Sequence, residues 1–207
     1  MYIRFFMENQ DKKRVIIIEA ALKRFAHYGL SKTTMSEIAK DISLSKALLY
    51  YYFPDKISLY VSTMEFLMDK ISRETVKSID KTTSSTEAVL KLLQKRQSYI
   101  QKYYNLFESS LTIGNDLPND LYDKFAKAKA FEKIIINSLL TRGIANNELA
   151  MDDTKLATDI FVDAIAGIHF NILAKDKSIF PGKDQFKEIF HKEKIFAEIF
   201  MAGLAVK

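Results

Sequence analysis

Reactive thiols and helix breakers are scarce in this chain. Its 207 residues include no cysteine, three prolines and six glycines. The lack of cysteine excludes disulfide bonds, cysteine-based metal sites and thiol nucleophiles. Few glycines and prolines favour long uninterrupted helices. No unbroken run of about 18 apolar residues is present, so we expect no membrane-spanning helix.

The start and the composition of the chain indicate its class. The opening segment MYIRFF is too short, and too soon followed by charge, to be a signal peptide, and Met7 is a second candidate for the first residue. The chain is 48% hydrophobic and 28% charged, which is typical of a folded protein and not of a disordered one. We therefore expect one or two folded domains in the cytoplasm.

Positive charge concentrates at the N-terminal end. Residues 1–60 carry ten lysines and arginines against six acidic residues, which is most of the chain's net charge of +5. Charge alone leaves two interpretations open, a solvated basic face or a surface for an anionic partner.

Apolar residues recur at helical spacing along the chain, as in Ile17, Ala21 and Phe25. Gly29 follows them, where a residue in the left-handed conformation would end the helix. No strand-like alternation of useful length occurs. We expect an all-α fold of about nine helices. Beyond the first helix and two short ones, the expected ranges are 54–79, 86–112, 118–127, 128–144, 152–175 and 183–204.

Two short helices follow Gly29. Thr34 and Glu37 have the spacing of a capping box that begins the first of them. Ser45 can cap the second, which runs from Lys46 to about Tyr52. Two helices of this length around a three-residue turn suit a DNA-binding helix-turn-helix, and they equally suit an αα-hairpin inside a bundle.

Three consecutive tyrosines favour the first of these interpretations. Successive helical residues point about 100° apart, so three neighbours cannot all face one core. The set expected to point inward is Leu49, Tyr52 and Phe53. The set expected to point outward is Lys46, Ala47, Tyr50 and Tyr51. An outward tyrosine can donate its hydroxyl to a phosphate while its ring packs in a DNA groove.

The stretch IIEAALKRFAHYGLSKTTMSEIAKDISLSKALLYYYFPDKISLY resembles the TetR (tetracycline repressor) family of bacterial transcription regulators. The resemblance covers residues 12–66 closely. It implies a helix-turn-helix DNA-binding domain over residues 8–53, with the motif at about 34–53. A connecting helix over 54–80 and a larger helical ligand-binding and dimerisation domain over 85–207 would follow. It also implies a repressor that binds operator DNA as a homodimer and is released by a small apolar or aromatic ligand.

The resemblance assigns DNA contacts to positions in and beside the motif. The residues expected to reach phosphate or base edges are Thr34, Ser36, Ser45, Lys46, Leu48, Tyr50, Tyr51 and Lys56. Two departures from the family pattern are present. Ser43 stands where the family commonly has glycine, so it must adopt a turn conformation that glycine adopts more easily. Leu48 replaces a hydroxyl-bearing residue, which affects operator preference.

The region over 85–207 is expected to bind the ligand and to dimerise. The candidate pocket residues are Tyr99, Tyr103, Phe107, Phe131, Ile135 and Phe161, for which a plain core role is the alternative. The candidate dimer residues are Phe161, Ile165, Ile168, Ile172, Ile189, Phe196, Ile199 and Phe200.

Catalytic patterns are missing from this region of the sequence. Its two histidines, His169 and His191, stand far apart, and no glycine-rich phosphate loop or carboxylate–histidine cluster is visible. We therefore expect no enzyme activity, no metal and no cofactor. Two alternatives remain: an enzyme on an all-α scaffold, and a dimeric partner-binding module without DNA recognition.

Overall fold

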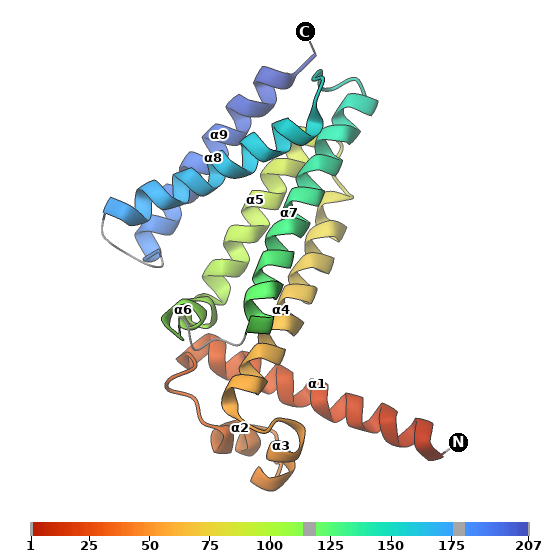
Figure 1. The fold of residues 1–207 in the computed structure, drawn as a ribbon, viewed down its shortest axis with the longest axis vertical. Helices are drawn as coiled ribbons and strands as arrows, with labels where there is room; N and C mark the ends of the chain where they lie inside the picture. Colours follow the sequence, from red (N-terminus) through yellow and green to blue (C-terminus); the bar gives the residue numbers. More distant parts are fainter. Residues whose placement is uncertain (1, 114–118, 176–180, 207) are drawn as a thin grey trace. The chain divides into compact units, whose positions relative to one another are not determined.

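The computed structural model describes residues 2–113, 119–175 and 181–206, and side chains for 12–108, 130–175, 181–182 and 184–206. Within this part of the chain there are nine helices and no strand, which confirms the all-α expectation (Figure 1). The helices are α1 (Tyr2–Tyr28), α2 (Met35–Asp41), α3 (Lys46–Tyr52), α4 (Lys56–Ile79), α5 (Ser85–Lys102), α6 (Tyr104–Ile113), α7 (Asn119–Ala145), α8 (Thr154–Lys175) and α9 (Lys183–Leu204).

Two expectations about helix boundaries are wrong. The single helix expected over 86–112 forms α5 and α6, which are separated at Tyr103. The two helices expected over 118–127 and 128–144 form the continuous helix α7. Residues 119–142 contain neither proline nor glycine, so no residue in that stretch breaks the backbone hydrogen bonding of the helix.

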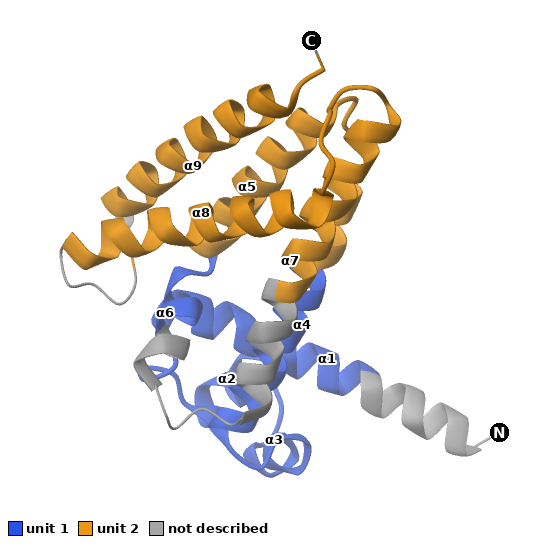
Figure 2. Ribbon diagram, turned by 45° about the horizontal axis from the view of Figure 1, so that its top comes forward, with its two compact units in different colours: residues 1–71, 102–117 blue, residues 72–101, 118–207 orange. Residues whose placement is uncertain are grey.

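The chain divides into two compact units (Figure 2). Unit 1 comprises Met1–Ile71 and Lys102–Leu117, and unit 2 comprises Ser72–Gln101 and Pro118–Lys207. Helix α4 therefore begins in unit 1 and ends in unit 2. Helix α6 lies in the sequence region expected to form the C-terminal domain, yet it belongs to unit 1.

Contacts with α1 and α4 explain the place of α6 in unit 1. The side-chain amide of Asn105 donates to two carbonyls at the end of α1, at 3.0 and 2.8 Å. The hydroxyl of Tyr60, on α4, donates to the carbonyl of Leu106 at 2.6 Å. The ring of Tyr60 also meets Phe25 of α1 edge to face, with 5.5 Å between centroids. These contacts are long-range, which is why the periodicity of the sequence did not indicate them.

Helices α5, α7, α8 and α9 and the end of α4 enclose the apolar core of unit 2. Phe161 of α8 is buried, and its ring centroid lies 5.5 Å from that of Phe196 and 5.3 Å from that of Phe200, both on α9. Helices α8 and α9 lie side by side (Figure 1). Next to the end of α9, Leu149 and Ala205 form an isolated antiparallel bridge.

One of the described helices, α8, is long and apolar enough to cross a membrane by length and composition. The sequence of α8 contains no unbroken apolar run of this length, because Asp159 and Asp163 interrupt it. The carboxylate of Asp159 pairs with the ammonium of Lys133 on α7 at 2.7 Å. Helix α8 packs against both α7 and α9, so it is part of the helical core of unit 2.

Candidate functional site

Helices α2 and α3 of unit 1 pack against each other across a short turn. Ser43, in this turn, has a φ of 52°, the left-handed conformation that was expected at this position. The backbone amide of Leu44 donates to the carbonyl of Ala39 at 2.9 Å and closes the turn. The pair is therefore a helix-turn-helix with a serine in the place that favours glycine.

Both short helices begin at the predicted caps. The Thr34 hydroxyl accepts from the backbone amide of Glu37 at 3.3 Å, and the Glu37 carboxylate accepts from the backbone amide of Thr34 at 2.9 Å. Hydrogen bonds from the Thr34 side chain and backbone lower the pKa of Glu37. Ser45 accepts from the amide of Leu48 at 3.1 Å and caps α3. The capping box and the second cap are confirmed, and the phosphate contact of Thr34 stays a prediction.

Arg24, which the sequence patterns did not indicate, binds two carboxylates of the helix-turn-helix. The guanidinium of Arg24, on α1, donates to both carboxylate oxygens of Asp41, at 2.5 and 2.9 Å. It also lies 3.5 Å from the carboxylate of Glu37. The hydrogen bonds from Arg24 lower the pKa of Asp41. Arg24 thus ties α1 to the last residue of α2, and no short-range pattern links positions 17 residues apart.

Helix α3 has one buried face and one exposed face. Leu49 is fully buried and Phe53, which follows the helix, is 2% exposed, whereas Tyr51 is 70% exposed and Tyr50 is 41% exposed. Tyr52 is half-buried, and its ring meets that of Tyr51 edge to face at 5.4 Å. The expected division of the helix into inward and outward residues is therefore confirmed.

The remaining predicted contact residues of the motif lie at its surface. Ser36 of α2 is exposed, as are Ser45 and Lys46, and Leu48 is half-buried. The ammonium of Lys46 lies 5.8 Å from the ring centroid of Tyr50, so a positive charge lies beside an exposed phenol. This surface combines hydroxyls, a cation and aromatic rings.

Lys56 opens α4 and is bound within unit 1. Its ammonium donates to the carbonyl of Leu30 at 2.8 Å and to the carbonyl of Thr33 at 3.1 Å. These bonds tie the start of α4 to the turn between α1 and α2. An ammonium carries three donors, so the phosphate contact predicted for Lys56 stays a prediction beside this structural role.

Unit 2 contains a cavity of about 290 Å³ between α5, α7 and α8. Its apolar wall is formed by Phe161, Val162, Ile165 and Ala166. Its polar wall is formed by Arg96, Glu132 and His169. The mixture of an apolar wall with a few polar groups is typical of a small-molecule site.

Behind the polar wall lies a buried carboxylate. Glu193 of α9 is 2% exposed, and its Oε1 accepts from the guanidinium of Arg96 at 2.5 Å and contacts Nε2 of His169. Arg96 also donates to Oε1 of Glu132 at 2.7 Å. Burial raises the pKa of Glu193, but the hydrogen bond with His169 and the charge of Arg96 outweigh burial, so that the net pKa is lowered. The Glu193 carboxylate is therefore held in its charged form.

The six residues predicted to line a pocket are divided between the two units. Phe161 lines the cavity. The others in unit 2 lie in or against the apolar core: Tyr99, Phe131 and Ile135. The two in unit 1 are Tyr103 and Phe107. The polar wall was missed, because its members come from helices that are distant in sequence.

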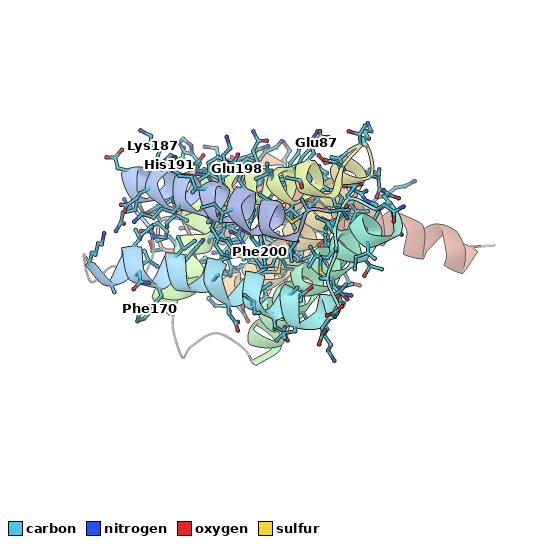
Figure 3. The ribbon with its side chains drawn as sticks, turned by 90° about the horizontal axis from the view of Figure 1, so that it is seen from above. Glu87, Phe170, Lys187, His191, Glu198 and Phe200 are labelled. Atoms are coloured by element: carbon cyan, nitrogen blue, oxygen red, sulfur yellow. The ribbon has the colours of Figure 1, made fainter. Side chains whose placement is uncertain are left out.

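The residues predicted for dimerisation lie largely inside unit 2. Buried ones are Phe161, Ile165, Ile172 and Ile189, and half-buried ones are Ile168, Phe196 and Phe200. Ile199 is 67% exposed. The exposed apolar residues of α8 and α9 are Leu156, Ile160, Phe170, Ile195 and Ile199. Figure 3 shows Phe170 on the outer side of α8 and Phe200 between α8 and α9.

The chain is similar to known regulators. Residues 17–63 match the family model for bacterial regulatory proteins of the tetR family. The chain is 44% identical over 59 residues to the uncharacterized HTH-type transcriptional regulator YuxN of Bacillus subtilis, covering 28% of this chain and 20% of that protein. It is 26% identical over 112 residues to IcaR of Staphylococcus aureus, the negative transcriptional regulator of the biofilm operon icaADBC, covering 52% of this chain and 60% of IcaR.

The similarity to a solved structure extends over nearly the whole chain. The structure of a transcriptional regulator from Cytophaga hutchinsonii ATCC 33406 matches with a TM-score of 0.82 and 28% identity, covering 94% of this chain and 99% of that one. By contrast, the chain spans less than two thirds of the length of YuxN and of IcaR.

An exposed, aromatic second helix in a helix-turn-helix has the arrangement with which such motifs enter a DNA groove. The chain carries an N-terminal segment that matches the tetR family of bacterial regulatory proteins, and its similarity to transcriptional regulators extends over most of its length. Its relatives and structural neighbours are regulators and not enzymes, which removes the enzyme alternative.

Proposed function

We propose that the chain is a cytoplasmic repressor that binds operator DNA as a homodimer and is released by a small molecule. The DNA-binding part of this proposal rests on the outward face of α3, where Tyr51 is 70% exposed while Leu49 is fully buried on the inward face. A helix anchored on one side and exposed on the other can enter a major groove. The name of IcaR as a negative regulator supports repression over activation.

A direct test uses DNA from the chain's own promoter. The purified protein should retard this duplex, and a scrambled duplex of equal length should bind much more weakly. Failure to bind any DNA from its genomic neighbourhood would refute the proposal and leave the partner-binding module as the remaining interpretation.

Replacing Tyr51 by alanine should reduce discrimination between operator and mutated operator by about 1–3 kcal/mol, because this ring is placed to touch a base edge or the groove wall. The side chain is highly exposed, so the melting temperature should change little. Titration with operator and scrambled duplexes, together with one melting curve, measures both quantities.

Two neighbouring variants serve as controls for Tyr51. Tyr50→Phe removes one hydroxyl and should cost about 0.5–1.5 kcal/mol of affinity for DNA, the value of one neutral hydrogen bond. Tyr52→Ala removes a half-buried ring and should mainly lower the melting temperature. If Tyr52→Ala lost DNA binding while Tyr51→Ala lowered the melting temperature, the assignment of Tyr52 as inward and Tyr51 as outward would be wrong.

The two lysines of the motif should respond differently. Lys46→Ala should weaken binding to all sequences and reduce the log–log salt slope by about 0.9 if one phosphate contact is lost. Lys56→Ala should do the same and also lower stability by about 1–3 kcal/mol, since its ammonium holds the carbonyls of Leu30 and Thr33. Titrations at several salt concentrations test this. An unchanged slope in the Lys56 variant would limit that residue to its structural role.

We place the effector in the cavity of unit 2. Helix α4 belongs to both units, so it can transmit a change in unit 2 to the helix-turn-helix. Its end contributes Val76 and Ile79 to the core of unit 2, and its first residue, Lys56, holds the turn that precedes α2. A ligand that favours one arrangement of unit 2 would shift α4 and change the spacing of the two α3 helices in the dimer. DNA and ligand would then oppose each other with a coupling of about 1–3 kcal/mol.

Exposed apolar side chains on both α8 and α9 support the homodimer. Solvent exposure of so many large apolar groups is unfavourable in a monomer. Gly167 of α8 and Gly203 of α9 have open space where a Cβ would stand. A second copy related by a two-fold axis would bury the same face on both chains.

A further inference from the structure

We propose that the effector is a small organic cation with an apolar part, held by Glu132 and the ring of Phe161 in the cavity of unit 2. This inference rests on the proposed function, because it names the class of ligand that the regulator would take.

The charges around the cavity do not cancel. Arg96 contributes one positive charge, and Glu132 and Glu193 contribute two negative charges. These three charges sum to −1 beside the cavity. Partly buried charge of one sign is unfavourable, and an added cation brings the sum to zero. An added carboxylate would instead make the sum of these charges −2.

Glu132 is placed to receive this cation. Its Oε1 accepts from Arg96 at 2.7 Å, and within the described part of the chain its Oε2 receives no hydrogen bond. Arg96 is meanwhile engaged on both sides, by Glu132 and by the buried Glu193. The charge of Arg96 is therefore compensated by protein groups, while Glu132 keeps an acceptor for a ligand ammonium.

The apolar lining of the cavity suits the rest of such a molecule. Phe161 offers a ring, and a cation within about 6 Å of a ring centroid is attracted by its quadrupole. Val162, Ile165 and Ala166 extend this wall with aliphatic groups. The volume of about 290 Å³ lies at the small end of ligand pockets, so we expect a short chain or a single ring as the apolar part.

The test uses three probes that differ in charge and share one apolar chain: hexylammonium, hexan-1-ol and hexanoate. Binding to the 207-residue chain is measured by calorimetry at about pH 8, where an alkylammonium is protonated and a carboxylate is ionised. Hexylammonium should bind about tenfold or more tightly than hexan-1-ol, because one charge-assisted hydrogen bond is gained. Hexanoate should bind most weakly.

The variant E132Q removes the charge and keeps an oxygen that can accept from Arg96. It should lose about tenfold in affinity for hexylammonium and little for hexan-1-ol. The matched control is E198Q, an exposed glutamate on α9 outside the cavity, which should leave both affinities unchanged (Figure 3).

Three results would overturn the inference: tightest binding of hexanoate, equal binding of cation and alcohol by the wild-type protein, or no binding of any probe. The comparison within the wild-type protein holds even if E132Q fails to fold. Operator binding is measured in parallel. If it persists while the ligand class fails, the proposed function stands; if it is absent, the proposed function itself has failed.

Discussion

Replacing Ile199 by glutamate is expected to dissociate the homodimer and to weaken operator binding by about 10²–10⁴-fold, the gain that linking two binding modules commonly provides. Ile199 is 67% exposed on α9, the helix that packs against α8. A carboxylate there would be desolvated in a dimer and solvated in a monomer, so the change acts on association more than on folding. Sedimentation measures the oligomeric state, and titration with operator DNA measures the affinity.

Ile134 offers a matched control for this substitution. It is 64% exposed on α7, so Ile134→Glu makes the same chemical change outside α8 and α9. The Ile134 variant should remain dimeric and should bind operator as the wild type does. A dimeric Ile199 variant with normal affinity would contradict the proposed interface, provided that its melting curve shows a folded protein.

Replacing Arg96 by methionine is expected to lower the free energy of unfolding by about 3 kcal/mol, at the lower end of the range for breaking a buried ion pair. The loss arises at Glu193, which is 2% exposed and would keep its carboxylate without the guanidinium. His169 still contacts this carboxylate, and Glu132 is partly solvated, which limits the penalty. Denaturant unfolding monitored by circular dichroism measures the change.

A second substitution tests whether the unpaired charge is the cause. In the double variant Arg96→Met with Glu193→Leu, an apolar pair replaces the ion pair, so most of the lost stability should return. If the double variant is as unstable as Arg96→Met alone, the packing of the arginine side chain, and not its charge, accounts for the loss.

The loss of stability in acid tests the contribution of Glu193 independently. The pKa of folded Glu193 is lowered, so its contribution is present above the ordinary glutamate pKa of about 4.3 and is lost as the pH falls through the folded value. The wild-type protein should therefore lose stability below about pH 4.3 more steeply than Glu193→Gln does. Parallel slopes for the two proteins would remove Glu193 from the cause of acid destabilisation.

The DNA-binding surface was predictable from the sequence because local rules govern it. A capping box spans four residues, a helix-turn-helix spans about twenty, and the direction of a side chain on a helix follows from its position. The left-handed Ser43, the caps at Thr34 and Ser45 and the exposed Tyr51 all lie within that range. The resemblance to the TetR family covers this same region.

Unit 2 was predictable as helical but not in its contacts. Helices α8 and α9 are apolar on more than one side, so periodicity could not tell the core face from the exposed face. The structure buries Ile165 and Ile189 and exposes Phe170. Arg96 and Glu193 meet across 97 positions of sequence, where no spacing rule applies.

The sequence by itself therefore determined the all-α class, the helix-turn-helix, the turn at Ser43 and the outward face of α3, since each depends on interactions between near neighbours in the chain. Tertiary structure alone decided that α6 joins unit 1, that Lys56 binds two backbone carbonyls, and that Arg96, Glu132, His169 and Glu193 meet around one cavity. These features depend on which distant helix faces pack together, and that choice is made by the shape and burial of the whole core.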